Sequence, residues 1–333
     1  MTAPLLSVRD LAVTFRSDEG DVTAVRGMSF DVMPGEVLAV VGESGSGKSV
    51  TSLAIMGLLP RSARVSGSAM FDGRELIGAG VKELRKIRGK DIAMIFQDPM
   101  TALNPVFTVG SQIAEAITLH NDMNDKAAWE RATELLNLVG IPDPKRRVRL
   151  YPHEYSGGMR QRAMIAMAIA NEPKLLIADE PTTALDVTIQ AQVLQVIRQA
   201  QAVTGAAMVL ITHDLGVVAG LADRVNVMYA GAVFESGDID DIFYRTANPY
   251  TLGLLGSIPI LTARVSDKLT PIPGAPPNLL RLPEGCPFRP RCVFATEVCH
   301  GSEPDLMAVN GGRHRSRCYH IDKVAEARAG STV

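Results

Sequence analysis

The chain has 333 residues, with 36 acidic and 34 basic side chains and a formal net charge of −2. This balance, without any run of like charges, excludes the basic surfaces typical of proteins that bind nucleic acid or anionic lipid. Met1–Asp10 lack a secretion-signal pattern, and no apolar run approaches the ~20 residues needed to cross a bilayer. We therefore expect neither export nor a membrane span, and the length predicts one large and one small domain.

Short apolar strands alternate with helical patterns along most of the chain. Leu5–Phe15 and Ala24–Val32 have the strand-turn-strand rhythm of an antiparallel edge sheet. A helix is predicted from Lys48 to about Leu59. The remaining predicted strands are Val37–Val41, Asp91–Phe96, Leu175–Ala178, Met208–Thr212 and Arg224–Met228. This order predicts an α/β domain with a largely parallel, buried sheet.

Two segments depart from the alternation. Helical patterns at Val109–His120 and Lys126–Val139 predict a helical subdomain at about residues 98–160. From Pro271 prolines become frequent, which opposes regular helix or central strand. We therefore predict a large domain over residues 1–260 and a small C-terminal extension over residues 261–333.

A phosphate-binding loop is predicted directly after the strand Val37–Val41. The sequence G-x-x-x-x-G-K-S opens a helix there, as a phosphate loop requires. Its residues are Gly42, Glu43, Ser44, Gly45, Ser46, Gly47, Lys48 and Ser49. Its backbone N–H groups would surround the phosphates, Lys48 would reach the β and γ phosphates, and Ser49 would ligate Mg²⁺. The alternative is a glycine-rich turn with an incidental lysine.

The apolar strand Leu175–Ala178 ends in two carboxylates, Asp179 and Glu180. A buried strand rarely ends in this way unless the charges face a cation or a reacting group. Asp179 would hold Mg²⁺, and Glu180 would act as the general base for the attacking water. Alone, the two carboxylates are weak evidence for a catalytic site, because acidic residues are common at strand ends. The evidence becomes stronger because a phosphate loop is also predicted.

The segment Tyr155-Ser156-Gly157-Gly158-Met159 resembles the signature motif of ABC transporter ATPases, Leu-Ser-Gly-Gly-Gln. Tyr155 and Met159 depart from that form, as in peptide-importer members. The resemblance implies an ABC-type ATPase fold in which Ser156, Gly157 and Gly158 face the nucleotide of a second ATPase subunit. Taken alone, Ser-Gly-Gly could equally be an N-cap turn.

Four further positions resemble those of the same family. The resemblance implies that Gln97 contacts Mg²⁺ and the water, that Asp186 belongs to the D-loop Ala184-Leu185-Asp186, and that His213 contacts the γ-phosphate. It also implies that Phe15 stacks on adenine. From the residues alone, His213 could be a structural or solvated histidine, and Phe15 could be a core residue.

The C-terminal part resembles the extension of dipeptide and oligopeptide importer ATPases, through Asn248-Pro249-Tyr250-Thr251 and Pro271-Ile272-Pro273-Gly274. The resemblance implies an ATP-hydrolysing subunit, peripheral on the cytoplasmic face of the plasma membrane. Its implied partners are two membrane-spanning permease subunits, a paralogous ABC ATPase and a solute-binding protein, with no nucleic acid. The alternatives are an importer of nickel or another small solute and a non-transport ABC ATPase.

All four cysteines, Cys286, Cys292, Cys299 and Cys318, lie in the C-terminal extension. Such clustering in a cytosolic chain indicates metal binding more than disulfides. Four thiolates can bind one [4Fe–4S] cluster or one zinc ion, and the spacing C-x5-C-x6-C-x18-C does not decide between them. The family resemblance implies the cluster, with zinc and then free thiols as alternatives.

Overall fold

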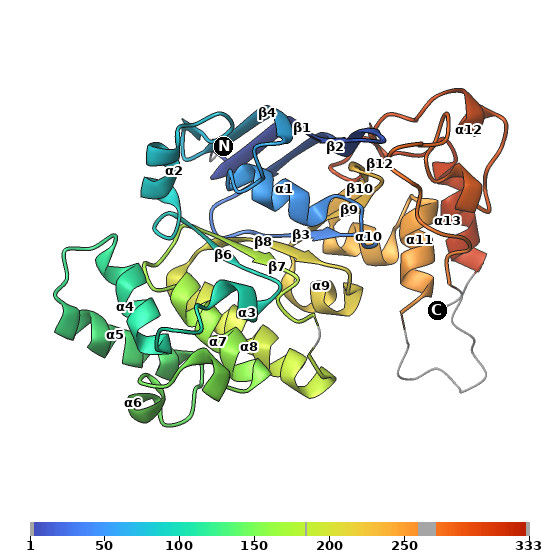
Figure 1. Ribbon diagram of the computed structural model, residues 1–333. Helices are drawn as coiled ribbons and strands as arrows, with labels where there is room; N and C mark the ends of the chain where they lie inside the picture. Colours follow the sequence, from blue (N-terminus) through green and yellow to red (C-terminus); the bar gives the residue numbers. More distant parts are fainter. Residues whose placement is uncertain (1–2, 184, 259–270, 331–333) are drawn as a thin grey trace. The chain divides into compact units, whose positions relative to one another are not determined.

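The computed structural model describes residues 3–183, 185–258 and 271–330 (Figure 1). The chain forms two compact units. The first unit comprises Met1–Leu6, Asp31–Val37 and Phe71–Ile211. The second comprises Ser7–Phe30, Leu38–Met70 and Thr212–Val333. Ala184 of the predicted D-loop and the predicted domain boundary between residues 260 and 261 lie outside the described residues.

The first unit contains a parallel sheet of the strands β6 (Ile92–Ile95), β7 (Leu175–Asp179) and β8 (Ala207–Thr212), in that order. Every residue of the three strands is buried. Strands buried on both faces read as continuous apolar runs, which is why the sequence predicts them to within about one residue.

Helices make up most of the remaining first unit. They are α2 (Val81–Ile87), α3 (Pro99–Ala102), α4 (Val109–Thr118), α5 (Asp125–Leu138), α6 (Pro144–Arg147), the 3₁₀ helix η1 (Pro152–Glu154), α7 (Gly157–Ala168) and α8 (Val187–Thr204). α4, α5 and α7 pack against one another (Figure 1). Thr108 and Asn124 cap α4 and α5 by accepting from backbone N–H groups, which fixes both starts near the predicted positions. The limits 98–160 for a helical subdomain stay a prediction.

The second unit contains two sets of strands. β2 (Gly20–Val32), β1 (Leu6–Ser17) and β4 (Ala63–Phe71) lie side by side in the antiparallel subdomain. β3 (Val37–Val41) pairs in parallel with β9 (Arg224–Tyr229). β10 (Ala232–Asp238) continues antiparallel from β9, followed by β12 (Arg315–Ser316) and β11 (Met307–Ala308). The predicted α/β fold with an antiparallel edge sheet is confirmed.

The second unit also contains short helices, from α1 near its N-terminus to α13 at the C-terminal end (Figure 1). They are α1 (Lys48–Ile55), α9 (Leu215–Leu221), α10 (Ile239–Tyr244), α11 (Pro249–Gly256), the 3₁₀ helix η2 (Arg289–Arg291), α12 (Val298–Gly301) and α13 (Ile321–Gly330). α1 ends at Ile55, earlier than the predicted Leu59. Gly57 adopts φ +60°, and the N–H of Leu58 donates to Leu53 O, which is the Schellman pattern that terminates a helix.

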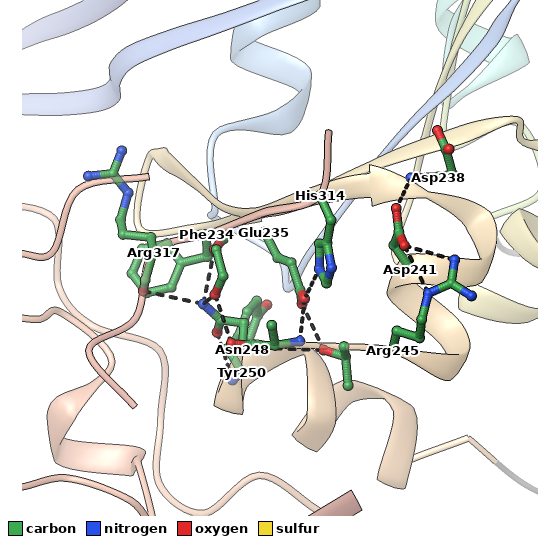
Figure 2. Close-up of polar contacts among 12 residues, drawn as sticks. Phe234, Glu235, Asp238, Asp241, Arg245, Asn248, Tyr250, His314 and Arg317 are labelled. Atoms are coloured by element: carbon green, nitrogen blue, oxygen red, sulfur yellow. Dashed lines mark hydrogen bonds and ion pairs between the residues drawn. The ribbon is translucent and has the colours of Figure 1, made fainter. Parts of the chain in front are cut away.

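The described part of the C-terminal extension, residues 271–330, is attached to β10 by a buried polar network (Figure 2). The Glu235 carboxylate on β10 is fully buried; it contacts His314 Nε2 at 2.8 Å and accepts from Thr246 Oγ1 at 2.8 Å and from the N–H of Ala247. Asn248 Nδ2 donates to Phe234 O at 2.9 Å. Glu235 therefore joins the segment that follows β10 to His314, which lies 79 residues away in the extension.

No helix in the described part of the chain is both long and apolar enough to cross a membrane.

Candidate nucleotide-binding site

The phosphate loop (Gly42–Ser49) lies in the second unit, between the end of β3 and the first turn of α1. The Lys48 side chain is directed back along the loop, where its Nζ donates to Gly42 O at 2.8 Å and to Glu43 O at 3.0 Å. Lys48 is only 4% exposed. The strand, loop and helix therefore follow one another as a phosphate-binding loop requires.

Gly47 shows why the loop needs glycine at its helix junction. Its φ is +101°, and a Cβ built there would lie 2.3 Å from Ala24 O on β2. Both the left-handed backbone and the close approach of another backbone exclude a larger residue. The loop is therefore packed against β2 with no space for a side chain.

Glu43, the second residue of the loop, is held from two sides. Its backbone N–H donates to Tyr250 Oη at 2.9 Å, and its carboxylate forms a two-armed ion pair with Arg291, at 2.6 and 2.9 Å. Burial raises the pKa of Tyr250, so the phenol stays neutral and can accept this bond. The hydrogen bonds that Arg291 donates to the Glu43 carboxylate raise the pKa of Arg291. Both partners come from beyond residue 248, far from the loop in sequence.

The predicted catalytic carboxylates lie in the first unit. Asp179 ends β7 and is buried. Glu180 follows at φ +45°, and its Oε2 accepts from Thr183 Oγ1 at 2.8 Å and from Gln97 Nε2 at 3.3 Å. The structure thus brings Gln97 and Glu180 together, as expected if they act on the same water. Their catalytic roles stay a prediction.

The predicted signature residues begin α7. Ser156 is its N-cap, and Ser156 Oγ accepts weakly from Met159 N at 3.4 Å. Gly158 lies so close to α8 that a Cβ would be 2.8 Å from the Ile189 side chain. Asp186 caps α8 by accepting from Ile189 N at 3.0 Å. The N-cap alternative is therefore correct as a local description, and the contact with a second subunit's nucleotide stays a prediction.

Two further predicted residues lie on the second unit. Phe15 lies on β1 and is half-buried, whereas Leu11 and Val13 are fully buried. Phe15 is therefore not a full core residue, and its stacking on adenine stays a prediction. His213 is exposed directly after β8.

The four cysteines line a single cavity in the C-terminal extension, together with Phe234 and Phe288. The cavity has a volume of 20 Å³, which exceeds the roughly 10–15 Å³ that one water molecule needs. Burial raises the pKa of Cys286 to about 11 and that of Cys318 to about 12, so both are protonated at neutral pH unless a cation stabilises the thiolate. Among the described residues, no three His, Cys, Asp or Glu side chains converge closely enough to hold a single metal ion.

The sequence reasoning missed three residues that contact predicted site residues. Thr183 bonds to Glu180 only three positions later, so the local sequence contained that signal. Tyr250 and Arg291 contact Glu43 across 207 and 248 residues, and no spacing rule could have indicated either one.

Comparison with known families identifies the general class. Residues 25–183 match the family described as ABC transporter, and residues 234–299 match the C-terminal region of oligopeptide/dipeptide transporters. The solved dimeric ATP-binding cassette MJ0796, bound to ADP and Pi, is 26% identical, with a TM-score of 0.63 over 70% of this chain and 98% of that one. The fold and the phosphate loop are thus those of an ABC ATP-binding cassette.

Curated relatives narrow the class further. The oligopeptide transport ATP-binding protein OppD of Mycobacterium tuberculosis is 57% identical over 97% of this chain, which spans only 53% of that relative's length. The dipeptide transport ATP-binding protein DppD of Bacillus subtilis is 54% identical over 97% of this chain and 96% of its own. The chain belongs to the family of oligopeptide and dipeptide transport ATP-binding proteins.

Proposed function

We propose that this chain is the ATP-binding and ATP-hydrolysing subunit of an ABC importer that drives uptake of dipeptides or oligopeptides across the cytoplasmic membrane. The observation that carries the proposal is the 54% identity to a dipeptide transport ATP-binding protein over nearly the full length of both chains. The phosphate loop at the start of α1 supports ATP as the ligand.

In this function the described residues divide the work of hydrolysis. Lys48 neutralises the β and γ phosphates, and Ser49 with Asp179 would hold Mg²⁺, which supplies further charge neutralisation. Glu180, oriented by the hydrogen bonds from Gln97 and Thr183, accepts the proton of the attacking water. His213 would contact the γ-phosphate, and Phe15 would stack on adenine.

The proposed assembly contains a second, paralogous ATPase, two membrane-spanning permease subunits and a solute-binding protein, with this chain peripheral on the cytoplasmic face. The dimeric form of the MJ0796 cassette supports a pair of ATPase subunits. In that pair Ser156, Gly157, Gly158 and Asp186 would face the partner's nucleotide. The exposure of Ser156 and Asp186 in this chain is consistent with that contact.

Reconstitution tests this function directly. The chain, co-purified with its permease and binding-protein partners in liposomes, should hydrolyse ATP faster when a dipeptide or oligopeptide is added. Glu180→Gln should abolish the stimulated turnover while ATP still binds, and the surface variant Glu172→Gln should behave as wild type. Stimulation of ATP hydrolysis by nickel alone would favour the small-solute alternative. A rate of ATP hydrolysis that no added solute changes would contradict a role in import.

We also propose that Cys286, Cys292, Cys299 and Cys318 hold one [4Fe–4S] cluster. The proposal is supported by the four thiols around one cavity and by the soft donor set that iron–sulfur clusters use. Zinc needs all four sulfurs at about 2.3 Å from one point, whereas a cluster takes each thiolate on a separate iron. The two metals therefore require different arrangements of the same four thiolates.

Metal analysis of anaerobically purified chain tests the cluster. We expect a brown protein with about four irons per chain, and loss of most iron in Cys292→Ser. Colourless protein with one zinc would overturn the cluster in favour of zinc, and protein with neither metal would show free thiols.

A further inference from the structure

The phosphate loop contains an acid, Glu43, where the ligand is a polyphosphate. Lys48 Nζ lies 3.0 Å from Glu43 O, so a phosphate held by Lys48 would lie within roughly 10 Å of the Glu43 carboxylate. Salt would largely screen two exposed charges at that distance, but Lys48 is buried and the Glu43 side chain is only 25% exposed, and partly buried charges are screened much less. An uncompensated carboxylate here would oppose ATP binding, and the loop needs a compensating charge.

Arg291 supplies this charge from the C-terminal extension. Its Nη1 and Nη2 donate to Glu43 Oε2 and Oε1 at 2.6 and 2.9 Å, a paired geometry that fixes the direction of the carboxylate as well as its charge. The Arg291 side chain is 5% exposed and that of Glu43 25%, so water screens the pair less than it screens a surface pair.

Arg291 is itself held rigidly. Its Nε donates to Pro273 O at 2.9 Å, and its guanidinium lies 5.9 Å from the ring centres of Tyr229 and Phe288. Tyr229, Tyr250 and Phe288 contact one another, with ring centres 4.6 to 5.4 Å apart. Tyr250 Oη accepts from the Glu43 backbone. One aromatic cluster therefore supports both contacts to Glu43.

We propose that Arg291 is a positioning residue of the nucleotide site, which pairs with the Glu43 carboxylate and so removes its repulsion of the ATP phosphates. The C-terminal extension thereby completes the nucleotide site instead of being only an appendage to it. This inference rests on the proposed function, because it requires that the loop binds ATP.

Four forms of the full chain test the proposal by equilibrium binding of Mg·ATP and Mg·ADP. Arg291→Met keeps the length of the side chain but frees the carboxylate, so ATP affinity should fall about tenfold, and ADP affinity less because ADP carries less charge. Glu43→Gln should bind ATP as tightly as wild type or more tightly. The double variant Glu43→Gln/Arg291→Met should return to within about threefold of wild type.

The rescue separates a charge effect from a merely structural one. If Arg291 only stabilised the fold of the extension, the double variant would bind ATP as weakly as Arg291→Met does. That result would overturn the proposal. Arg245→Met is the matched control, because Arg245 forms an exposed ion pair with Asp241 and should change nothing. If Arg291→Met fails to fold, the ATP affinity of Glu43→Gln tests the proposal. A loss of affinity in Glu43→Gln would show that the carboxylate helps ATP binding, and this would overturn the proposal. A wild-type chain that does not bind ATP would contradict the proposed function instead.

Discussion

The phosphate loop and the C-terminal extension lie in the same unit but are held in different ways. The loop gets its shape from backbone contacts, such as the approach of Gly47 to Ala24 O, and from a lysine directed at carbonyls five and six residues away. The extension is attached by the pairing of its strand β12 with β10 and by side chains, at Glu235 with His314, Arg291 with Glu43 and Glu303 with Arg26. Local geometry therefore builds the loop, and pairwise chemistry across the chain holds the extension to it.

The largest effect expected from this difference is that of Gly47→Ala. A methyl group at φ +101°, 2.3 Å from Ala24 O, adds backbone strain and a clash with backbone, so it should cost ~4 kcal/mol of unfolding free energy and abolish ATP binding. Urea unfolding measures the cost. Gly35→Ala is the control, since Gly35 also has positive φ (+75°) but an open surrounding, and it should cost only ~1 kcal/mol. Equal losses in the two variants would show that close packing does not matter at Gly47.

Lys48→Ala should act on the ligand rather than on the fold. Removal of the ammonium group should weaken Mg·ATP binding about 100-fold, because in the proposed function its charge neutralises the β and γ phosphates. Titration with a fluorescent ATP analogue measures this loss. The metal content of the extension should stay at the wild-type level, because Lys48 is not among the residues that line the cysteine cavity. A parallel loss of ATP affinity and metal would mean that the two regions fold as one inseparable site.

The same difference explains what the sequence could predict. Buried parallel strands and the Gly-x-x-x-x-Gly-Lys-Ser loop have local signatures, so β3, β7 and the start of α1 were located to within a residue. β10 was missed because Glu235 and Gly237 interrupt its apolar pattern. Glu235 is buried only because His314 and Thr246 arrive from elsewhere in the chain. No local rule contains that information, and the pairing of Glu43 with Arg291 was missed for the same reason.

Glu235→Gln tests the attachment at β10. The amide keeps the shape of the side chain, but its NH₂ group faces donors where a carboxylate oxygen accepted, so unfolding free energy should fall by ~2 kcal/mol. Limited proteolysis should then cut the extension beyond Pro271 faster than in wild type. Glu326→Gln, at an exposed residue of α13, is the control and should be neutral. Unchanged stability in Glu235→Gln would mean that apolar packing and the pairing of β12 with β10, not this network, attach the extension.

The smallest effect is expected at the third attachment, the ion pair of Glu303 with Arg26. Its distances are short, 2.7 and 3.1 Å, but the two side chains are 23% and 20% exposed, so water and salt weaken the attraction. Arg26 also keeps its bond from Nε to Ala230 O when the carboxylate is lost. Glu303→Gln should therefore cost only ~0.5 kcal/mol, and the cost should shrink at 1 M salt, unlike that of Glu235→Gln. A loss of stability in Glu303→Gln as large as that in Glu235→Gln would show that paired charges hold the extension equally well whether they are buried or exposed. The expectation that the more buried contact contributes more would then be wrong.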